Sequence, residues 1–257
     1  MKRLLAALTI AALGAALGGW LGWRGAGDLP ADAEARALVA AAVTDPSAEF
    51  VERYDVLFGH QESGPGAAVV GSDEYKTGYA VVSVNVPADG FDALAARARA
   101  GFAEQGWDIE EYGELFAAVR DDWSVHAYPA TRCTPEDTDA CGSEVMVRAG
   151  ALGLQFERTP PAAVLPLAVI GWLLGLLAGW FGMTLLKPRH TGLLWTGLVL
   201  MLPATVVVTL GLVVEPGMLW EPYMGELFRP FALLGGLCLI AALGLVVVRR
   251  KVPATHD

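Results

Sequence analysis

The sequence predicts a multi-pass α-helical membrane protein with four transmembrane helices and one α+β domain outside the membrane. Residues 162–186 contain no charged side chain over a length that exceeds the roughly 20 residues that a helix needs to cross hydrocarbon. Three further uncharged runs lie at 4–23, 191–214 and 231–248, and one long polar segment, 24–160, follows the first of them. The mean hydropathy of +0.44 and the hydrophobic content of 54% also exceed what a soluble domain shows.

The charged residues are distributed unevenly along the chain, whose net charge is −10. Segment 24–160 has 24 acidic and 10 basic residues, a balance of −14. The short segments 1–3, 187–190 and 249–257 together hold seven Lys or Arg residues against a single acidic one, Asp257. Because basic flanks stay on the cytoplasmic side, both termini are predicted to be cytoplasmic and segment 24–160 to be extracytoplasmic.

The composition also narrows the classes of partner. An acidic outer domain repels nucleic acid and anionic lipid, so neither is expected as its main partner. The Ala/Gly/Val-rich sequence, with Arg preferred to Lys, is typical of a GC-rich bacterial genome, so the bacterial plasma membrane is the expected location. No cofactor, metal or catalytic site is predicted, since the sequence carries neither a GxSxG nor a paired-histidine motif.

Residues 1–23 combine a basic start with an apolar run of about 20 residues, which fits either a signal peptide or a signal anchor. Gly25-Ala26-Gly27 makes a poor cleavage site, and the run is long for a signal peptide. We therefore expect an uncleaved transmembrane anchor.

Within the outer domain, 24–160, residues 31–44 predict a short helix after Pro30, whereas 49–58 fits either a helix or a strand. Alternation and β-branched residues predict a strand at 79–86, and the spacing of Phe91, Leu94, Ala95, Ala98 and Phe102 predicts an amphipathic helix. Further strands are expected at 107–112, 115–119, 123–128, 145–149 and 152–156. The resulting β-α-β-β-β order predicts an antiparallel sheet with helices on one face.

Two cysteines, Cys133 and Cys141, flank a short polar loop between predicted strands. A disulfide between them would form readily outside the cytoplasm and would close a hairpin loop. The alternative is a calcium site made by the intervening acidic residues, but these lack the spacing of a calcium-binding loop. Cys238 lies in the last apolar run and is interpreted as a small packing residue.

Glycines recur every fourth residue in the first two apolar runs, at Gly14, Gly18 and Gly22 and at Gly171, Gly175 and Gly179. Such ridges allow close approach of helix backbones in lipid. Two hypotheses follow: the ridges join copies of the chain in a homo-oligomer, or the first two spans pack on each other within one chain. The second is the favoured interpretation.

The membrane-embedded runs at 162–186, 191–214 and 231–248 form a three-helix bundle, residues 161–248, followed by a basic tail at 249–257. Pro166 and Pro203 lie within these runs and are expected to kink their helices. Because none of the four spans carries an ionisable residue, an ion or proton pathway is not expected.

The predicted outer loop 214–230 contains Trp220, Glu221, Tyr223 and Phe228. Its aromatic residues fit the belt found at membrane–water interfaces. A second hypothesis is an interaction segment that docks beneath the outer domain or against a partner.

These patterns predict a non-enzymatic membrane protein whose outer domain binds a membrane or envelope protein or another envelope component. The alternative is an envelope enzyme with a pocket formed by the outer domain and loop 214–230, in which His126 would face Glu221. Alternation places Ser124, His126 and Tyr128 on one face of a strand, where the histidine is interpreted as structural.

Overall fold

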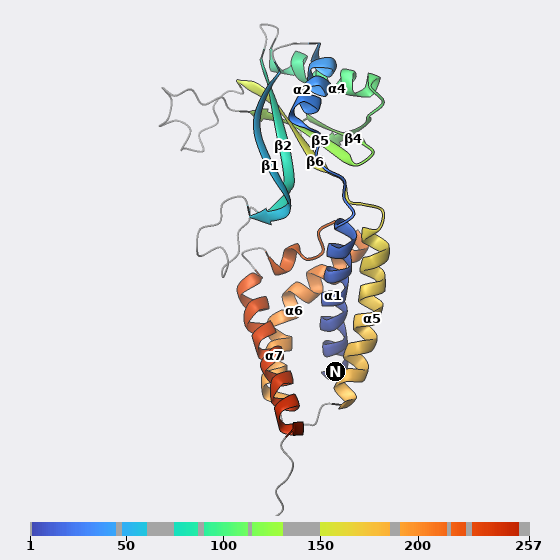
Figure 1. Cartoon of the computed structure of the whole chain (residues 1–257), viewed down its shortest axis with the longest axis vertical. Helices are drawn as coiled ribbons and strands as arrows, with labels where there is room; N and C mark the ends of the chain where they lie inside the picture. Colours follow the sequence, from blue (N-terminus) through green and yellow to red (C-terminus); the bar gives the residue numbers. More distant parts are fainter. Residues whose placement is uncertain are drawn as a thin grey trace, which may run out of the picture. The chain divides into compact units, whose positions relative to one another are not determined.

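The computed structural model describes the whole chain except residues 1, 45–47, 61–74, 87–89, 113–114, 131–149, 186–190, 215–216, 225–227 and 252–257. The chain forms two compact units, shown in Figure 1. We call them the helical unit, which comprises Met1–Gly25, Gly59–Lys76 and Pro160–Asp257, and the sheet unit, which comprises Ala26–Phe58 and Thr77–Thr159.

The helical unit contains four long helices and a 3-10 turn: α1 (Lys2–Trp23), α5 (Val164–Leu185), α6 (Thr191–Val214), η2 (Glu221–Tyr223) and α7 (Arg229–Lys251). Three of the helices are long and apolar enough to cross a membrane, over Arg3–Trp23, Val164–Met183 and Gly192–Val214. In α7 the described apolar part is Arg229–Ala242, which is shorter than a full span. Three candidate spans are therefore found where four were expected. Pro203 lies inside α6, as the sequence predicts.

Helices α1 and α5 pack with their backbones in contact along a seam of glycines. A Cβ atom added at Gly14 would lie 2.1 Å from the carbonyl oxygen of Gly171, and one added at Gly171 would lie 2.1 Å from the carbonyl oxygen of Gly14. A Cβ at Gly18 or Gly175 would likewise come within 2.3 Å of a carbonyl on the other helix. Only residues without a side chain permit this approach, so both glycine ridges face each other within one chain.

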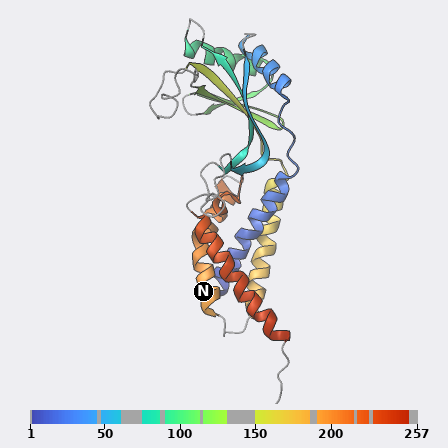
Figure 2. The same ribbon diagram turned by 60° about the vertical axis from the view of Figure 1, so that its left-hand side comes forward.

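The sheet unit is built on six strands: β1 (Glu49–His60), β2 (Tyr75–Asn85), β3 (Asp108–Tyr112), β4 (Leu115–Arg120), β5 (Trp123–Ala130) and β6 (Ala151–Arg158). The antiparallel sheet has the order β1-β2-β6-β5-β4-β3. Two helices, α2 (Asp32–Val43) and α4 (Phe91–Glu104), pack against it, and Figure 2 shows them from a second direction.

The hydrophobic core of the sheet unit lies between these helices and one face of the sheet. Alternating residues of the central strands, such as Val125 of β5 and Phe156 of β6, are fully buried there together with Phe102 of α4. The rings of Phe102 and Trp107 meet edge to face at 5.2 Å. Gly101 allows α4 to approach α2, because a Cβ at that position would lie 2.0 Å from the carbonyl oxygen of Ala42.

The predicted antiparallel sheet with helices is therefore confirmed in its coarse form. The ambiguous stretch 49–58 is a strand, and the predicted helix at 31–44 is α2. The strand predicted at 145–149 lies outside the described residues.

Candidate functional site

The sheet face that points away from α2 and α4 carries a group of polar and aromatic side chains. On β5 these are Ser124, His126 and Tyr128, which share a face as the sequence predicts because the core residue Val125 points the other way. The antiparallel register sets them opposite three residues of β6: Glu157, Gln155 and Gly153.

Tyr79, from β2, stands at one side of this group and is 3% exposed. Its hydroxyl donates a hydrogen bond to Glu52 Oε1 at 2.7 Å, and its ring lies 6.0 Å from that of Tyr54. Burial raises the pKa of Tyr79 well above the ordinary value for a phenol, and the hydrogen bond to Glu52 adds to the effect. The phenol is therefore held neutral.

Tyr128 lies directly over the bare backbone of Gly153. A Cβ at Gly153 would come within 2.5 Å of the tyrosine ring, so the glycine makes room for the ring on the sheet surface. Burial raises the pKa of Tyr128, and the negative charge of Glu52 raises it further. Both phenols are thus neutral hydrogen-bonding groups near the same carboxylate.

Glu157 lies between Gln155 and His126 on this face. Its Oε1 accepts a hydrogen bond from Gln155 Nε2 at 2.5 Å, and its Oε2 lies 3.9 Å from His126 Nε2. Within the described residues, no group of three His, Cys, Asp or Glu side chains converges as a metal site requires. We call Tyr54, Tyr79, His126, Tyr128 and Gln155 the tyrosine face.

Arg158, at the end of β6, holds β1, the strand that supplies Tyr54 to the tyrosine face. Its Nε donates to the carbonyl of Gly27 at 2.8 Å and its Nη1 to the carbonyl of Val56 at 3.0 Å. Arg158 is 8% exposed, and burial lowers its pKa, although nearby Asp28 and Asp55 oppose the shift.

Gly78 makes room for this arrangement, because a Cβ there would lie 2.0 Å from the carbonyl oxygen of Val56 and 2.9 Å from the Arg158 guanidinium.

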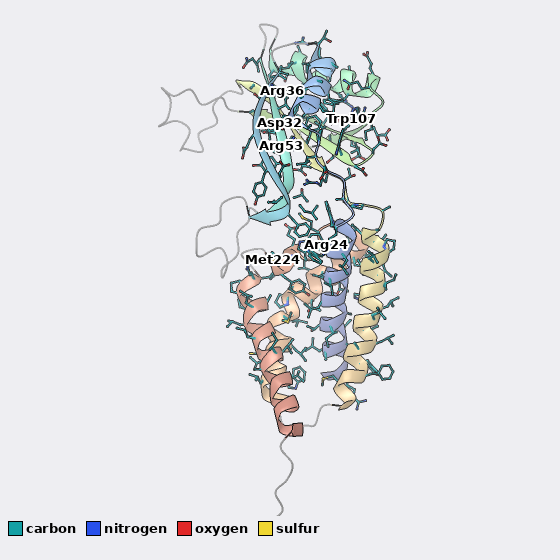
Figure 3. The ribbon with its side chains drawn as sticks, viewed as in Figure 1. Arg24, Asp32, Arg36, Arg53, Trp107 and Met224 are labelled. Carbon is teal, nitrogen blue, oxygen red and sulfur yellow. The ribbon has the colours of Figure 1, made fainter. Side chains whose placement is uncertain are left out.

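A second arginine, Arg53, ties β1 to the start of α2. Its Nε donates to Asp32 Oδ1 at 2.6 Å, and its Nη2 donates to the carbonyl of Pro30. Both Arg53 and Asp32 are labelled in Figure 3. Burial works to lower the pKa of Arg53, but the carboxylates of Asp55 and Asp32 outweigh it and raise the pKa. The two arginines thus hold β1, and with it Glu52 and Tyr54, in place.

The loop between α6 and α7 is built into the end of the helical unit. Leu219 and Trp220 are 3% and 5% exposed, and the Trp220 ring meets Trp23 edge-on at 6.3 Å. Trp23 Nε1 also donates to the carbonyl of Gly217 at 3.1 Å. The described part of the loop therefore packs on the end of α1.

The predicted interaction residues of this loop have different environments. Tyr223 packs against the core of the helical unit beside Leu219, Glu221 is exposed, and Phe228 is half-buried just before α7. Burial raises the pKa of Tyr223, while the Thr205 side chain acts in the opposite direction.

Other predicted site residues fall elsewhere. Cys133 and Cys141 lie outside the described residues, so their disulfide stays a prediction, and Cys238 is a half-buried free thiol of α7. His126 and Glu221 belong to different units, and their pairing also stays a prediction. The sequence pattern missed the carboxylates Glu52 and Glu157, for which only strand register could have been a signal.

No protein-family model matches this chain, and no match was found among curated proteins or solved structures.

Proposed function

We propose that the chain is a non-enzymatic integral protein of the bacterial plasma membrane whose sheet unit lies outside the cytoplasm and binds a partner protein through the tyrosine face. In this proposal α7 is the fourth span and both termini are cytoplasmic, as the basic flanking segments favour. The observation that carries the proposal is the gathering of three tyrosines on the sheet face opposite the helix-covered core. Tyrosine is enriched at protein interfaces, where one large ring supplies both apolar area and a hydrogen bond.

The chemistry of the tyrosine face supports binding more than catalysis. A general base or a nucleophile needs a pKa near the working pH, whereas the shifts of Tyr79 and Tyr128 keep both phenols neutral. Glu157 is engaged by Gln155 and stands close to His126, which favours a structural role for this carboxylate. The half-buried Tyr54 and Tyr128 are suited to pair with backbone and side-chain groups of another protein.

Site-directed photo-crosslinking in living cells tests the proposal. A photoreactive amino acid replaces Tyr128 or Ser83 on the tyrosine side of the sheet, and Ala96 or Ala100 on the exposed side of α4 as matched controls. We expect a discrete crosslinked protein from the first two positions and none from the controls.

Equal crosslinking from both sides, or none from either, would contradict the proposal. A glycan or lipid adduct in place of a protein would identify an envelope component as the ligand instead.

A further inference from the structure

The helical unit contains a cavity of about 780 Å³, lined by residues from α1, α5, α6 and α7. It forms because α1 packs mainly on α5 and α6, whereas α7 packs mainly on α6 and η2. Space is thus left between α7 and the α1–α5 pair. The volume falls within the range of about 300–1,000 Å³ that is usual for ligand pockets.

The cavity has the length of one lipid leaflet. Its lining on α7 runs from Arg229 to Ile240, about 16 Å at a rise of 1.5 Å per residue. Half of a hydrocarbon core of about 30 Å is nearly the same length. Gly182 and Gly236 line the cavity, and a Cβ added at either glycine would meet no atom within 4 Å.

The polarity of the lining is concentrated at one end. Among the described residues that line the cavity, all are Ala, Gly, Ile, Leu or Met except Tyr223 and Arg229. The Tyr223 hydroxyl is buried at this end of the cavity, where the Thr205 side chain interacts with it. Arg229 Nη1 lies 3.6 Å from the sulfur of Met224, a weak acceptor.

A planar guanidinium is the side chain best matched to a phosphate, to which it can donate two parallel hydrogen bonds. The Tyr223 hydroxyl can donate a third. The remaining lining offers only van der Waals contact, which suits a hydrocarbon chain.

We infer that this cavity binds one anionic membrane phospholipid, with an acyl chain along α7 and the phosphate at Arg229 and Tyr223. The inference goes beyond the proposed function and does not depend on it. Segment 24–160 has 24 acidic and 10 basic residues, whereas the cavity presents an arginine to its ligand.

Native mass spectrometry of the full-length protein in detergent tests the inference. Phosphatidylglycerol and phosphatidylcholine with identical acyl chains are added in parallel. We expect one tightly bound phosphatidylglycerol and at least tenfold weaker binding of phosphatidylcholine. Arg229→Gln should weaken phosphatidylglycerol binding about tenfold, because one charge-assisted hydrogen bond contributes about that factor. Arg24→Gln, which changes an arginine stacked on Trp20 outside the cavity lining, should leave binding unchanged.

Two glycines of α7 provide a matched pair of filling variants. Gly236→Phe places a ring in the cavity and should abolish lipid binding, whereas Gly244→Phe enters open space outside the cavity lining and should not. Equal retention of lipid by both variants, or equal affinity for the two lipids, would overturn the inference.

Photo-crosslinking of the wild-type protein with a phosphatidylglycerol that carries a diazirine in its acyl chain keeps the inference testable if a variant fails to fold. Adducts on peptides that contain Met183 or Met201 of the cavity lining support it. Adducts confined to other surfaces overturn it, as do crosslinks at these methionines to a second copy.

Discussion

Replacing Gly171 with alanine should destabilise the helical unit measurably, because the substitution adds one methyl group where two helix backbones touch. The new Cβ would lie 2.1 Å from the carbonyl oxygen of Gly14 and 2.8 Å from its carbonyl carbon. Both are backbone atoms, so no side-chain rotation relieves the overlap. The helices must separate locally by about 1.3 Å to restore an ordinary contact of 3.4 Å.

The loss of stability follows from the packing contacts between α1 and α5 that this separation removes. A gap of roughly 0.5–1 Å already forfeits a quarter to a half of the dispersion energy of each contact. Overpacking of one methylene costs about 1–3 kcal/mol in well-packed interiors, and the continuous seam between α1 and α5 places the Gly171→Ala change at the upper end of that range. Gly182→Ala is the matched control on the same helix, since its Cβ meets no atom within 4 Å, and it should change stability by less than about 0.5 kcal/mol.

Unfolding of the purified protein in mixed micelles, followed by tryptophan fluorescence as the fraction of SDS rises, measures both variants. The expected result is a lower midpoint for Gly171→Ala and an unchanged one for Gly182→Ala. Equal midpoints would refute the packing argument. If Gly171→Ala instead changed only the oligomeric state, the ridge would serve the homo-oligomer hypothesis and not the packing of one chain.

Three further outcomes are expected. Arg158→Met should lower the free energy of unfolding by about 1–3 kcal/mol, because two buried carbonyl groups lose their donor. Arg36→Met, on the exposed side of α2, is the control and should change the free energy of unfolding little in the same denaturation assay. The raised pKa of Tyr79 stabilises the folded state fully below about pH 10, the ordinary phenol pKa, and this contribution is lost as the pH rises through the folded-state pKa. The free energy of unfolding should therefore decline above about pH 10, and it should decline less steeply in Tyr79→Phe. Chemical denaturation at a series of pH values measures both. Cys133 and Cys141 should resist alkylation until a reductant is added, and intact-mass measurement that finds both thiols alkylated without reductant would exclude the disulfide.

The sheet unit could be predicted from the sequence wherever apolar residues alternate. The strand 123–128 places Val125 in the core and His126 on the other face because side chains alternate with a period of two. The stretch 49–58 stayed ambiguous because its charged residues mask that period. In the structure Glu52 and Arg53 of this strand pair with residues of other elements, which a local pattern does not contain.

The glycine ridges show a similar limit in the helical unit. A four-residue spacing places Gly171, Gly175 and Gly179 on one helix face, but it does not identify the surface that they meet. Contacts between residues more than 150 positions apart decide that, and they set these glycines against α1. Gly182 and Gly236, which border the cavity, do not continue the four-residue spacing, so the pattern of single helices does not predict the cavity.

Arg229 was not predicted as a site residue, because it lies just outside the predicted span 231–248. The predicted span 231–248 excludes it and therefore appears free of ionisable residues, yet Arg229 is the first residue of α7 and lines the apolar cavity. The N-terminal end of a helix carries a partial positive charge and favours a nearby anion. A guanidinium at the same end favours a phosphate as well, because it can donate two parallel hydrogen bonds. A phosphate at this position would face both the guanidinium and the end of α7, and this is the physical reason to expect an anionic lipid in the cavity instead of a neutral one.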